Sequence, residues 1–311
     1  MNQRTTQGRT SASCDGTSIR AFPKRGRLHR LAVPAIAAAA LIAFAQGAYA
    51  EDSENAGKVV ACSATISSCG CTITKGGFYQ VGAALSSSQG LTALNGCIDV
   101  KASNVTLNTG KETSRGRTDG GYSITGPGGG TPTGIGIHIL KGSNNDFIEL
   151  PSDVDSWDVG ILVQGASNIV EDFDANNNGT AGVEVVGGKG NNINDFGTGG
   201  NGSYGVWISG GGSNQVNCSD TDGNGKVGVL VGCPGSTSAA CSSKSNKIFD
   251  HTADGNGNYG IAIELGSTGN NVTDTSATGN GTDDLYDANS GCDSDLWYFN
   301  YFNTASASCI D

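Results

Sequence analysis

One phrase recurs in the second half of this chain and restricts the fold more than any other feature. It begins with an Asn, has Val or Ile two residues later, and continues ten residues on with Asn-Gly. The first Asn falls at Asn168, Asn191, Asn214, Asn246 and Asn270, and the second at Asn178, Asn201, Asn224, Asn256 and Asn280. The spacings of 23, 23, 32 and 24 residues indicate a repeat architecture, with one unit lengthened by an insertion from Cys233 to Ser245.

Each unit carries short apolar alternations with a period of two, as in Val183/Val185 and Val206/Ile208. A strand of about five residues cannot bury itself, but stacked copies pair with neighbours about 4.8 Å away. The sequence therefore predicts a parallel β-helix with three short strands per coil. Val183, Val206, Val229 and Ile261 should form one inward file. Asn and Gly should occupy tight corners that need positive φ, and equivalent Asn side chains should hydrogen-bond in a ladder.

The repeats resemble the right-handed parallel β-helix family, which includes pectate-lyase-like and NosD-like proteins. Two segments carry the likeness, Ser213-Asn214-Gln215-Val216 through Asp222-Gly223-Asn224-Gly225 and Gly269-Asn270-Asn271-Val272 through Thr278-Gly279-Asn280-Gly281. The likeness covers roughly residues 96 to 304 and implies an all-β, single right-handed solenoid of about eight coils, capped at both ends. It implies no single activity, because this fold hosts lyases, hydrolases, epimerases and non-enzymes alike.

The chain divides into four predicted segments. Residues 1–50 have a basic region, an apolar run from Leu31 to Phe44 and the small-residue signal Ala48-Tyr49-Ala50, as in a secretory signal peptide. An uncleaved membrane anchor is the alternative, but the apolar run is shorter than the ~18–20 residues of a spanning helix. Residues 51–95 are expected to form an N-terminal cap, residues 96–288 the β-helix repeats and residues 289–311 a C-terminal cap. Aromatic residues cluster in the last of these, at Trp297, Phe299, Tyr301 and Phe302.

Charge limits the partners of the mature chain. Without residues 1–50 it keeps 11 basic and 28 acidic side chains, a net charge of −17. Nucleic acid and anionic membranes are poor partners for such a surface, and acidic polysaccharides are poor partners too unless metal ions bridge. We expect a secreted, periplasmic or cell-surface protein, with no membrane span once the signal is removed.

Nine cysteines remain after residue 50 and are read as disulfides of an exported protein. Cys233 with Cys241, and Cys292 with Cys309, flank single segments and are predicted pairs. Cys62, Cys69, Cys71 and Cys97 should cross-link the N-terminal cap, in a connectivity that the sequence leaves open. Cys218 is left over and is predicted to be a buried free thiol.

The outward face of the repeated strand supplies the candidate site. Strand alternation places every second residue outward, and the corresponding positions hold His138, Glu184, Trp207 and Tyr286, separated by aliphatic residues. Trp207 could stack on a sugar ring, so these four residues are candidates for binding carbohydrate. In the alternative interpretation, the Gly-rich segment from Lys111 to Thr133, or another molecule, covers Trp207.

A file of carboxylates is also expected. Asp172, Asp195, Asp250 and Asp274 lie four residues after the first Asn of their units, with Cys218 in the remaining one. Stacked carboxylates about 5 Å apart raise one another's pKa unless a cation or N–H groups intervene. The favoured interpretation is that each Asp caps its own turn. The alternative is that Asp172 and Asp195 share Ca²⁺, the one cofactor that the sequence suggests.

Enzyme signatures are sparse. Pectate-type lyases of the resembled family use a basic residue beside calcium, yet this chain has no Arg after Arg117, and its repeat-region lysines are expected to share no outward position. Asp283-Asp284 lacks an accompanying Gly-His-Gly, and His138 and His251 are expected to stand alone, His251 as a solvated or packed imidazole. The sequence favours a non-catalytic surface or carbohydrate-binding protein with a polysaccharide or cell-surface glycan as partner. The alternative is a polysaccharide lyase or glycoside hydrolase with a divergent site at Glu184 or Asp283/Asp284.

Overall fold

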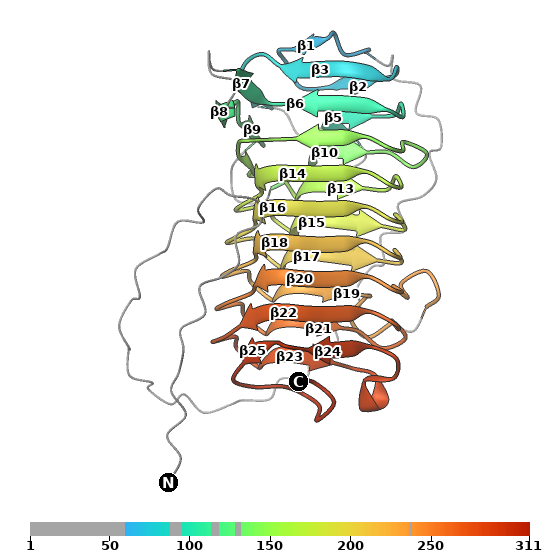
Figure 1. The fold of residues 1–311 in the computed structure, drawn as a ribbon. Helices are drawn as coiled ribbons and strands as arrows, with labels where there is room; N and C mark the ends of the chain where they lie inside the picture. Colours follow the sequence, from blue (N-terminus) through green and yellow to red (C-terminus); the bar gives the residue numbers. More distant parts are fainter. Residues whose placement is uncertain (1–59, 88–94, 113–117, 128–131, 237) are drawn as a thin grey trace, which may run out of the picture. The chain divides into compact units, whose positions relative to one another are not determined.

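The computed structural model describes residues 60–87, 95–112, 118–127, 132–236 and 238–311. The predicted signal peptide and the first residues after it lie outside this part of the chain. Two long parallel sheets, which we call sheets A and B, form the two main walls of a stack of coils (Figure 1). Among the described residues, no helix is long and apolar enough to cross a membrane.

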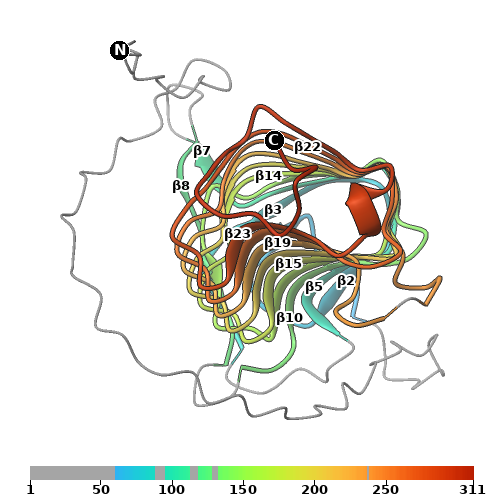
Figure 2. The same cartoon turned by 90° about the horizontal axis from the view of Figure 1, so that it is seen from below.

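Sheet A runs through nine strands in the order of the chain: β2 (Cys71–Ile73), β5 (Gly96–Val100), β10 (Ile135–Ile139), β13 (Val159–Val163), β15 (Ala181–Val186), β17 (Tyr204–Ser209), β19 (Val227–Val231), β21 (Tyr259–Ile263) and β23 (Asp283–Asp287). Viewed down the axis, β10, β15, β19 and β23 lie one behind another along one wall (Figure 2).

Sheet B alternates with sheet A along the chain and has eleven strands: β1 (Thr65–Ile66), β3 (Gly77–Val81), β6 (Val105–Asn108), β11 (Phe147–Glu149), β14 (Ile169–Asp174), β16 (Asn192–Gly197), β18 (Gln215–Asp220), β20 (Lys247–Thr252), β22 (Asn271–Ala277), β24 (Leu296–Tyr298) and β25 (Tyr301–Phe302). Both β24 and β25 pair with β22.

Smaller elements complete the early coils and the C-terminal end. A third parallel sheet, sheet C, joins β4 (Leu85–Ser86), β9 (Ile124–Thr125) and β12 (Val154–Asp155). An antiparallel pair joins β7 (Gly110–Glu112) and β8 (Thr118–Gly121), and a short 3₁₀ turn, η1, spans Ser290–Cys292.

The strand register confirms the predicted inward file. Val183 pairs with Val206, Val206 with Val229 and Val229 with Ile261, and none of the four side chains has measurable exposure. Sheet B contributes an equivalent file, in which Val170 pairs with Ile193 and Ile193 with Val216. Each short strand therefore buries its apolar side against other coils, and the core runs continuously along the axis.

The predicted Asn ladder is confirmed, and there are two of them. In the first, the side-chain oxygen of Asn214 accepts hydrogen bonds from the backbone N–H and the side-chain amide of Asn191, each at 3.0 Å. The Asn214 amide nitrogen then donates to the carbonyl of Gly188. The second ladder repeats this pattern, with Asn224 accepting from Asn201 and donating to Thr198. All of these side chains are buried.

The Gly after the second Asn serves a different purpose from the one predicted. Neither Asn224 nor Gly225 has a positive φ; the left-handed residue of this corner is Gly223, at φ 66°. A Cβ at Gly225 would instead collide with the carbonyl oxygen of Gly202 in the preceding coil. This position needs glycine because two coils approach closely there, and not because of its backbone angle.

The solenoid begins earlier than the predicted boundary at residue 96. The strands β2 and β3 pair in parallel with β5 and β6, so much of the segment expected to form an irregular cap is already coil. At the other end, β24 and β25 extend sheet B. Of the C-terminal aromatic residues, only Trp297 is buried, with its indole nitrogen donating to Asp287 at 2.9 Å. Phe299 and Tyr301 are exposed, which the prediction of an aromatic cap did not anticipate.

Four disulfides are described. The predicted pairs Cys233–Cys241 and Cys292–Cys309 are confirmed, and the N-terminal four pair as Cys62–Cys71 and Cys69–Cys97. The prediction for Cys218 was wrong. It is disulfide-bonded and only partly buried. Its φ of 52° belongs to a strand kink that recurs in β14, β16, β18, β20 and β22 of sheet B.

His251 is a packed imidazole inside the solenoid. Its Nδ1 and Nε2 lie 2.7 and 2.9 Å from the hydroxyls of Ser219 and Thr221, so it does not stand alone. Burial lowers the pKa of His251 to about 3, which keeps the ring neutral. We therefore assign His251 to the core.

The second ladder supplies a test of the fold. Replacing Asn224 by Ala should lower the free energy of unfolding by about 3 kcal/mol, because it strands the Asn201 N–H and the Thr198 carbonyl, at about 1–3 kcal/mol for each buried unsatisfied group. Chemical denaturation of the purified protein measures this loss. The matched control is Asn217→Ala in β18 of the same coil, where the partly exposed side chain has an unpartnered oxygen. Equal losses in the two variants would contradict the role of the ladder.

The last rung of the first ladder is a carboxylate, which makes it sensitive to pH. Asp295 accepts from the backbone and the amide of Asn270, and burial, reinforced by nearby Asp287, raises its pKa to about 6 despite these hydrogen bonds. A carboxyl with a raised folded-state pKa is stabilising when protonated, and this contribution is lost as the pH rises through about 6.

Asp295→Asn keeps the accepting oxygen and removes the charge, at the cost of one long contact from Asn289 at 3.3 Å. We expect the variant to exceed the wild type by about 1–2 kcal/mol at pH 8 and to show no such gain at pH 4. Thermal unfolding at both pH values measures this. The control is Asp250→Asn, because Asp250 is exposed and is not among the charges that raise the pKa of Asp295. A gain of equal size at pH 4 would show that charge is not the cause.

Candidate functional site

The four predicted carbohydrate-binding residues lie in one lateral file on the outer face of sheet A. Strand pairing sets the order along this file as Asp99, His138, Leu162, Glu184, Trp207, Leu230, Ala262 and Tyr286. Glu184 and Trp207 are direct neighbours. His138 is two strands, or roughly 10 Å, from Glu184, and Tyr286 is three strands beyond Trp207. The file therefore forms a row along the solenoid and does not gather its polar groups at one point.

Much of this outward face is buried. Leu162, Leu230 and Ala262 have no measurable exposure, and they belong to two apolar clusters separate from the central core. His138 and Glu184 occupy the predicted positions of the file but are only 5% and 3% exposed, so a role for them in binding carbohydrate stays a prediction. Strand alternation predicts direction, whereas exposure depends on what packs against the face. Trp207 and Tyr286 remain partly exposed.

Aromatic rings gather around the C-terminal part of the file. Trp207 packs against Tyr204 with ring centroids 5.1 Å apart, and Tyr259 stacks on Tyr286 at 4.4 Å and 17°. We call these four residues the aromatic row. Burial raises the pKa of Tyr204, Tyr259 and Tyr286, and the negative charge of Glu264 adds to the rise at each phenol. The row therefore offers neutral phenol groups close to one carboxylate.

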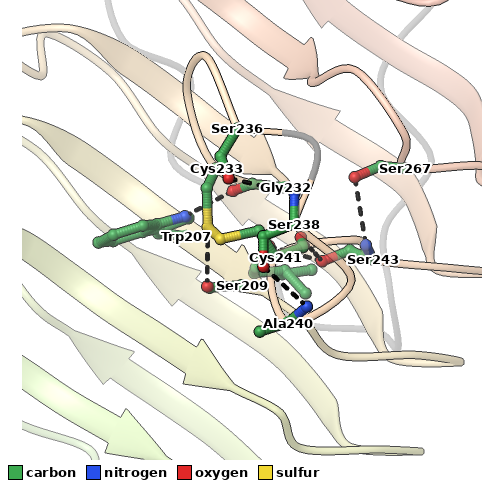
Figure 3. Close-up of a disulfide and its surroundings, with 11 residues drawn as sticks. Trp207, Ser209, Gly232, Cys233, Ser236, Ser238, Ala240, Cys241, Ser243 and Ser267 are labelled. Atoms are coloured by element: carbon green, nitrogen blue, oxygen red, sulfur yellow. Dashed lines mark hydrogen bonds between the residues drawn. A yellow bond between two sulfur atoms is a disulfide. The ribbon is translucent and has the colours of Figure 1, made fainter. Parts of the chain in front are cut away.

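The indole of Trp207 is held at Gly232, the residue that directly precedes the insertion. Its Nε1 donates to the carbonyl of Gly232 at 2.7 Å, next to the Cys233–Cys241 disulfide (Figure 3). The described parts of the Lys111–Thr133 segment bond elsewhere, as where the Tyr122 N–H donates to Thr109. The disulfide-closed turn thus orients the indole, while the ring itself stays partly exposed.

His138 has the acidic partner that the sequence did not reveal. Its Nδ1 lies 3.5 Å from a carboxylate oxygen of Asp99 in the neighbouring coil, and its Nε2 lies 3.1 Å from the side-chain oxygen of Gln164. Asp99 also accepts the backbone N–H of Gly96 at 2.8 Å. The prediction that this His stands alone was wrong, because its partners come from other coils 39 and 26 residues away.

The predicted carboxylate file occupies the recurrent kink in the strands of sheet B. Asp172 and Asp195 have φ values of 58° and 52°, a left-handed conformation that Asp tolerates better than most residues. Burial raises the pKa of Asp172, and neighbouring Asp195 adds to the rise, as expected for stacked carboxylates. Among the described residues, no group of three or more His, Cys, Asp or Glu side chains is arranged to hold a metal ion. Calcium at Asp172 and Asp195 stays a prediction.

Other acidic residues have structural partners. Asp222 accepts the backbone N–H of Asp254 in the next coil, and Asp254 in turn accepts from Thr278. Asp284 ends the second ladder. Although burial opposes its ionisation, hydrogen bonds from Asn280, Asn303 and Thr304 hold the pKa of Asp284 below its usual value. Asp284 is therefore a poor proton donor for the divergent enzyme site proposed there.

Two lysines lie in one lateral file that was not predicted from the sequence. Lys189 and Lys244 share a lateral file, separated only by Gly212. Each lies two residues before a ladder Asn, a signal that was present in the sequence but was concealed by the insertion between them.

No protein-family model matches the chain, and no curated protein matches it. Solved structures do match. The A-module of the mannuronan C-5 epimerase AlgE6 from Azotobacter vinelandii is 17% identical with a TM-score of 0.50, over 73% of this chain and 65% of that one. The Dettilon tailspike protein is 13% identical with a TM-score of 0.51, over 75% of this chain and 51% of that one. The chain thus spans less than two thirds of either protein.

This chain has the right-handed parallel β-helix fold. Pectate lyase Pel9A also matches, at 14% identity and a TM-score of 0.39, over 78% of this chain and 71% of that one. At such identities the likeness shows the fold alone, because parallel β-helices carry many unrelated functions.

Proposed function

We propose that this protein is an exported, non-catalytic β-helix protein that binds a glycan on the aromatic row. The observation that supports this most is the presence of four neighbouring aromatic residues, of which Trp207, Tyr259 and Tyr286 are partly exposed. Aromatic faces accept the C–H faces of sugar rings, and the polar edges of Tyr and Trp hydrogen-bond to hydroxyls. A row along the solenoid suits an extended chain of sugars better than a single small molecule.

The carboxylates beside the row fit the same ligand. Glu264 is close enough to raise the pKa of all three tyrosines, and Glu184 adds to the rise at Tyr204. Burial raises the pKa of Glu264 itself, against a hydrogen bond from the backbone of Gly235. A partly buried carboxyl group next to aromatic faces is a strong acceptor for sugar hydroxyls.

Export is supported by the disulfides. Four pairs are described in one small domain, and such bonds persist in oxidising compartments outside the cytoplasm. The N-terminal sequence of residues 1–50 favours the same localisation. The proposed destinations are the periplasm, the cell surface or the medium.

Glycan-array binding followed by calorimetry tests the proposal. Trp207→Ala and Tyr286→Ala should each weaken binding about tenfold, the equivalent of about 1.4 kcal/mol for one lost aromatic face. Trp207→Phe should keep most of the affinity. The control is Phe78→Ala, which removes an exposed ring from β3 in sheet B. Unchanged binding in both alanine variants would contradict the proposal that the glycan binds on the aromatic row.

A polysaccharide-cleaving enzyme is the second candidate, and the contact between His138 and Asp99 favours it. A carboxylate 3.5 Å from one ring nitrogen can attract a protonated imidazole, although Nδ1 makes no hydrogen bond to it in this structure. The burial of His138 and the engagement of its Nε2 by Gln164 oppose this role, because the substrate must reach that nitrogen. The mature protein should be screened on a polysaccharide panel with and without calcium. Cleavage that is abolished in His138→Gln would replace the binding proposal by this one.

A further inference from the structure

A groove of about 600 Å³ lies in the middle of the solenoid, on the turns that connect strands of sheet A to the following strands of sheet B. Its lining includes Lys189, Gly212, Ser213, Ser242, Lys244 and Ser245. The size is within the range of about 300–1,000 Å³ that is typical of small-ligand sites. Lysines and hydroxyls supply hydrogen-bond donors, so the groove is rich in donors, and no carboxylate lines it.

The two lysines are placed by the repeat itself. Lys189 pairs with Gly212, and Gly212 pairs with Lys244, so the three residues stack in successive coils. The two lysine backbones are therefore about 10 Å apart, twice the strand spacing. Gly212 contributes no side chain between them, which leaves an open floor over which two flexible ammonium groups can converge.

The charges of this groove are uncompensated within the described residues. Neither Lys189 nor Lys244 has a carboxylate within ion-pair distance there, although the chain as a whole has a net charge of −11. Both lysines are exposed at the surface. The positions equivalent to them in the adjacent coils are Ala166 and Thr268, so no acidic side chain enters this file. A local positive site thus exists on a protein of opposite net charge.

The groove lies beside the insertion that directly follows Gly232, the residue that holds Trp207. The Cys233–Cys241 disulfide closes this insertion, with Cys233 packed against Ser209 of β17 (Figure 3). Ser242 and Lys244 follow directly after the disulfide, and Ser243 is anchored to the carbonyl of Ile208 at 2.9 Å. One short covalently closed turn therefore separates the aromatic row from the lysine groove.

We propose that the Lys189–Lys244 groove binds an oxyanion, a carboxylate or sulfate group carried by a glycan. The two ammonium groups bind the anion from the coils on either side of Gly212, and the hydroxyls of Ser213 and Ser245 supply neutral hydrogen-bond donors. This inference rests on the proposed glycan-binding function. It specifies a glycan whose acidic group lies in the groove, on the other side of the insertion from the aromatic row and its carboxylates. It also reverses the expectation from net charge, under which acidic polysaccharides need a bridging metal.

The test compares three oligosaccharide probes: an oligogalacturonate, a sulfated galactan oligomer and a neutral galactan oligomer. Isothermal titration at low salt without divalent cations should show the acidic probes binding at least tenfold more tightly than the neutral one. The double variant Lys189→Gln/Lys244→Gln should abolish this preference, and 0.5 M NaCl should reduce it in the wild type because salt screens exposed charges. The control is Lys101→Gln, at an exposed lysine in an early coil.

Each result decides between the alternatives. If the double variant loses its preference for the carboxylate probe alone, the groove binds carboxylate groups. If it loses its preference for the sulfate probe alone, the groove binds sulfate groups. Equal binding of acidic and neutral probes by the wild type overturns the inference and leaves the glycan-binding proposal intact. An acidic preference unchanged in the double variant also overturns it. If the double variant loses binding of the acidic probes while Trp207→Ala has no effect, the result supports oxyanion binding in the groove and contradicts glycan binding on the aromatic row.

Discussion

Amide-to-amide hydrogen bonding along the two Asn ladders is the interaction on which the rest of the structure depends. A solenoid corner exposes backbone groups that no strand can pair, and a buried unpaired group costs about 1–3 kcal/mol. Each ladder Asn meets this need in two directions. As Asn214 shows, its oxygen accepts from one Asn, and its nitrogen donates to a carbonyl near the corner. The ladders fix the vertical register, and the register aligns the apolar files.

The ends of the ladders show why Asn is required within them. An internal rung needs both a donor and an acceptor, whereas a terminal rung needs only an acceptor. Accordingly, Asp295 closes the first ladder and Asp284 closes the second, each accepting from the last Asn. The C-terminal aromatic segment repeats the strand kink without a carboxylate: Phe299 has a left-handed φ of 60°, close to the 51° of Asp274 in the preceding coil.

Much of the fold could be predicted from the sequence because its determinants are local and repeated. The Asn spacing identified the coils, and Val183 through Ile261 identified the inward file. The site was harder because its contacts join coils with no shared motif. Asp99 and Gln164 meet His138 only after stacking, and the coil that contains Asp99 has no ladder Asn to mark it. Burial of Glu184 could not be read from alternation, which gives the direction of a side chain but not what covers it.

The insertion between Asn214 and Asn246 shows how a solenoid acquires a specific surface. Asn191, Asn214 and Asn246 make the same bonds, at 3.0 Å, although one interval is 23 residues and the other 32. The extra residues therefore leave the corner unchanged and project outward, where a disulfide limits their conformations. Because the ladder hydrogen bonds are unchanged by the extra residues, the insertion can position Trp207 on one side and Lys244 on the other. The repeat supplies the rigid frame, and one irregular coil supplies the two surfaces proposed for recognition.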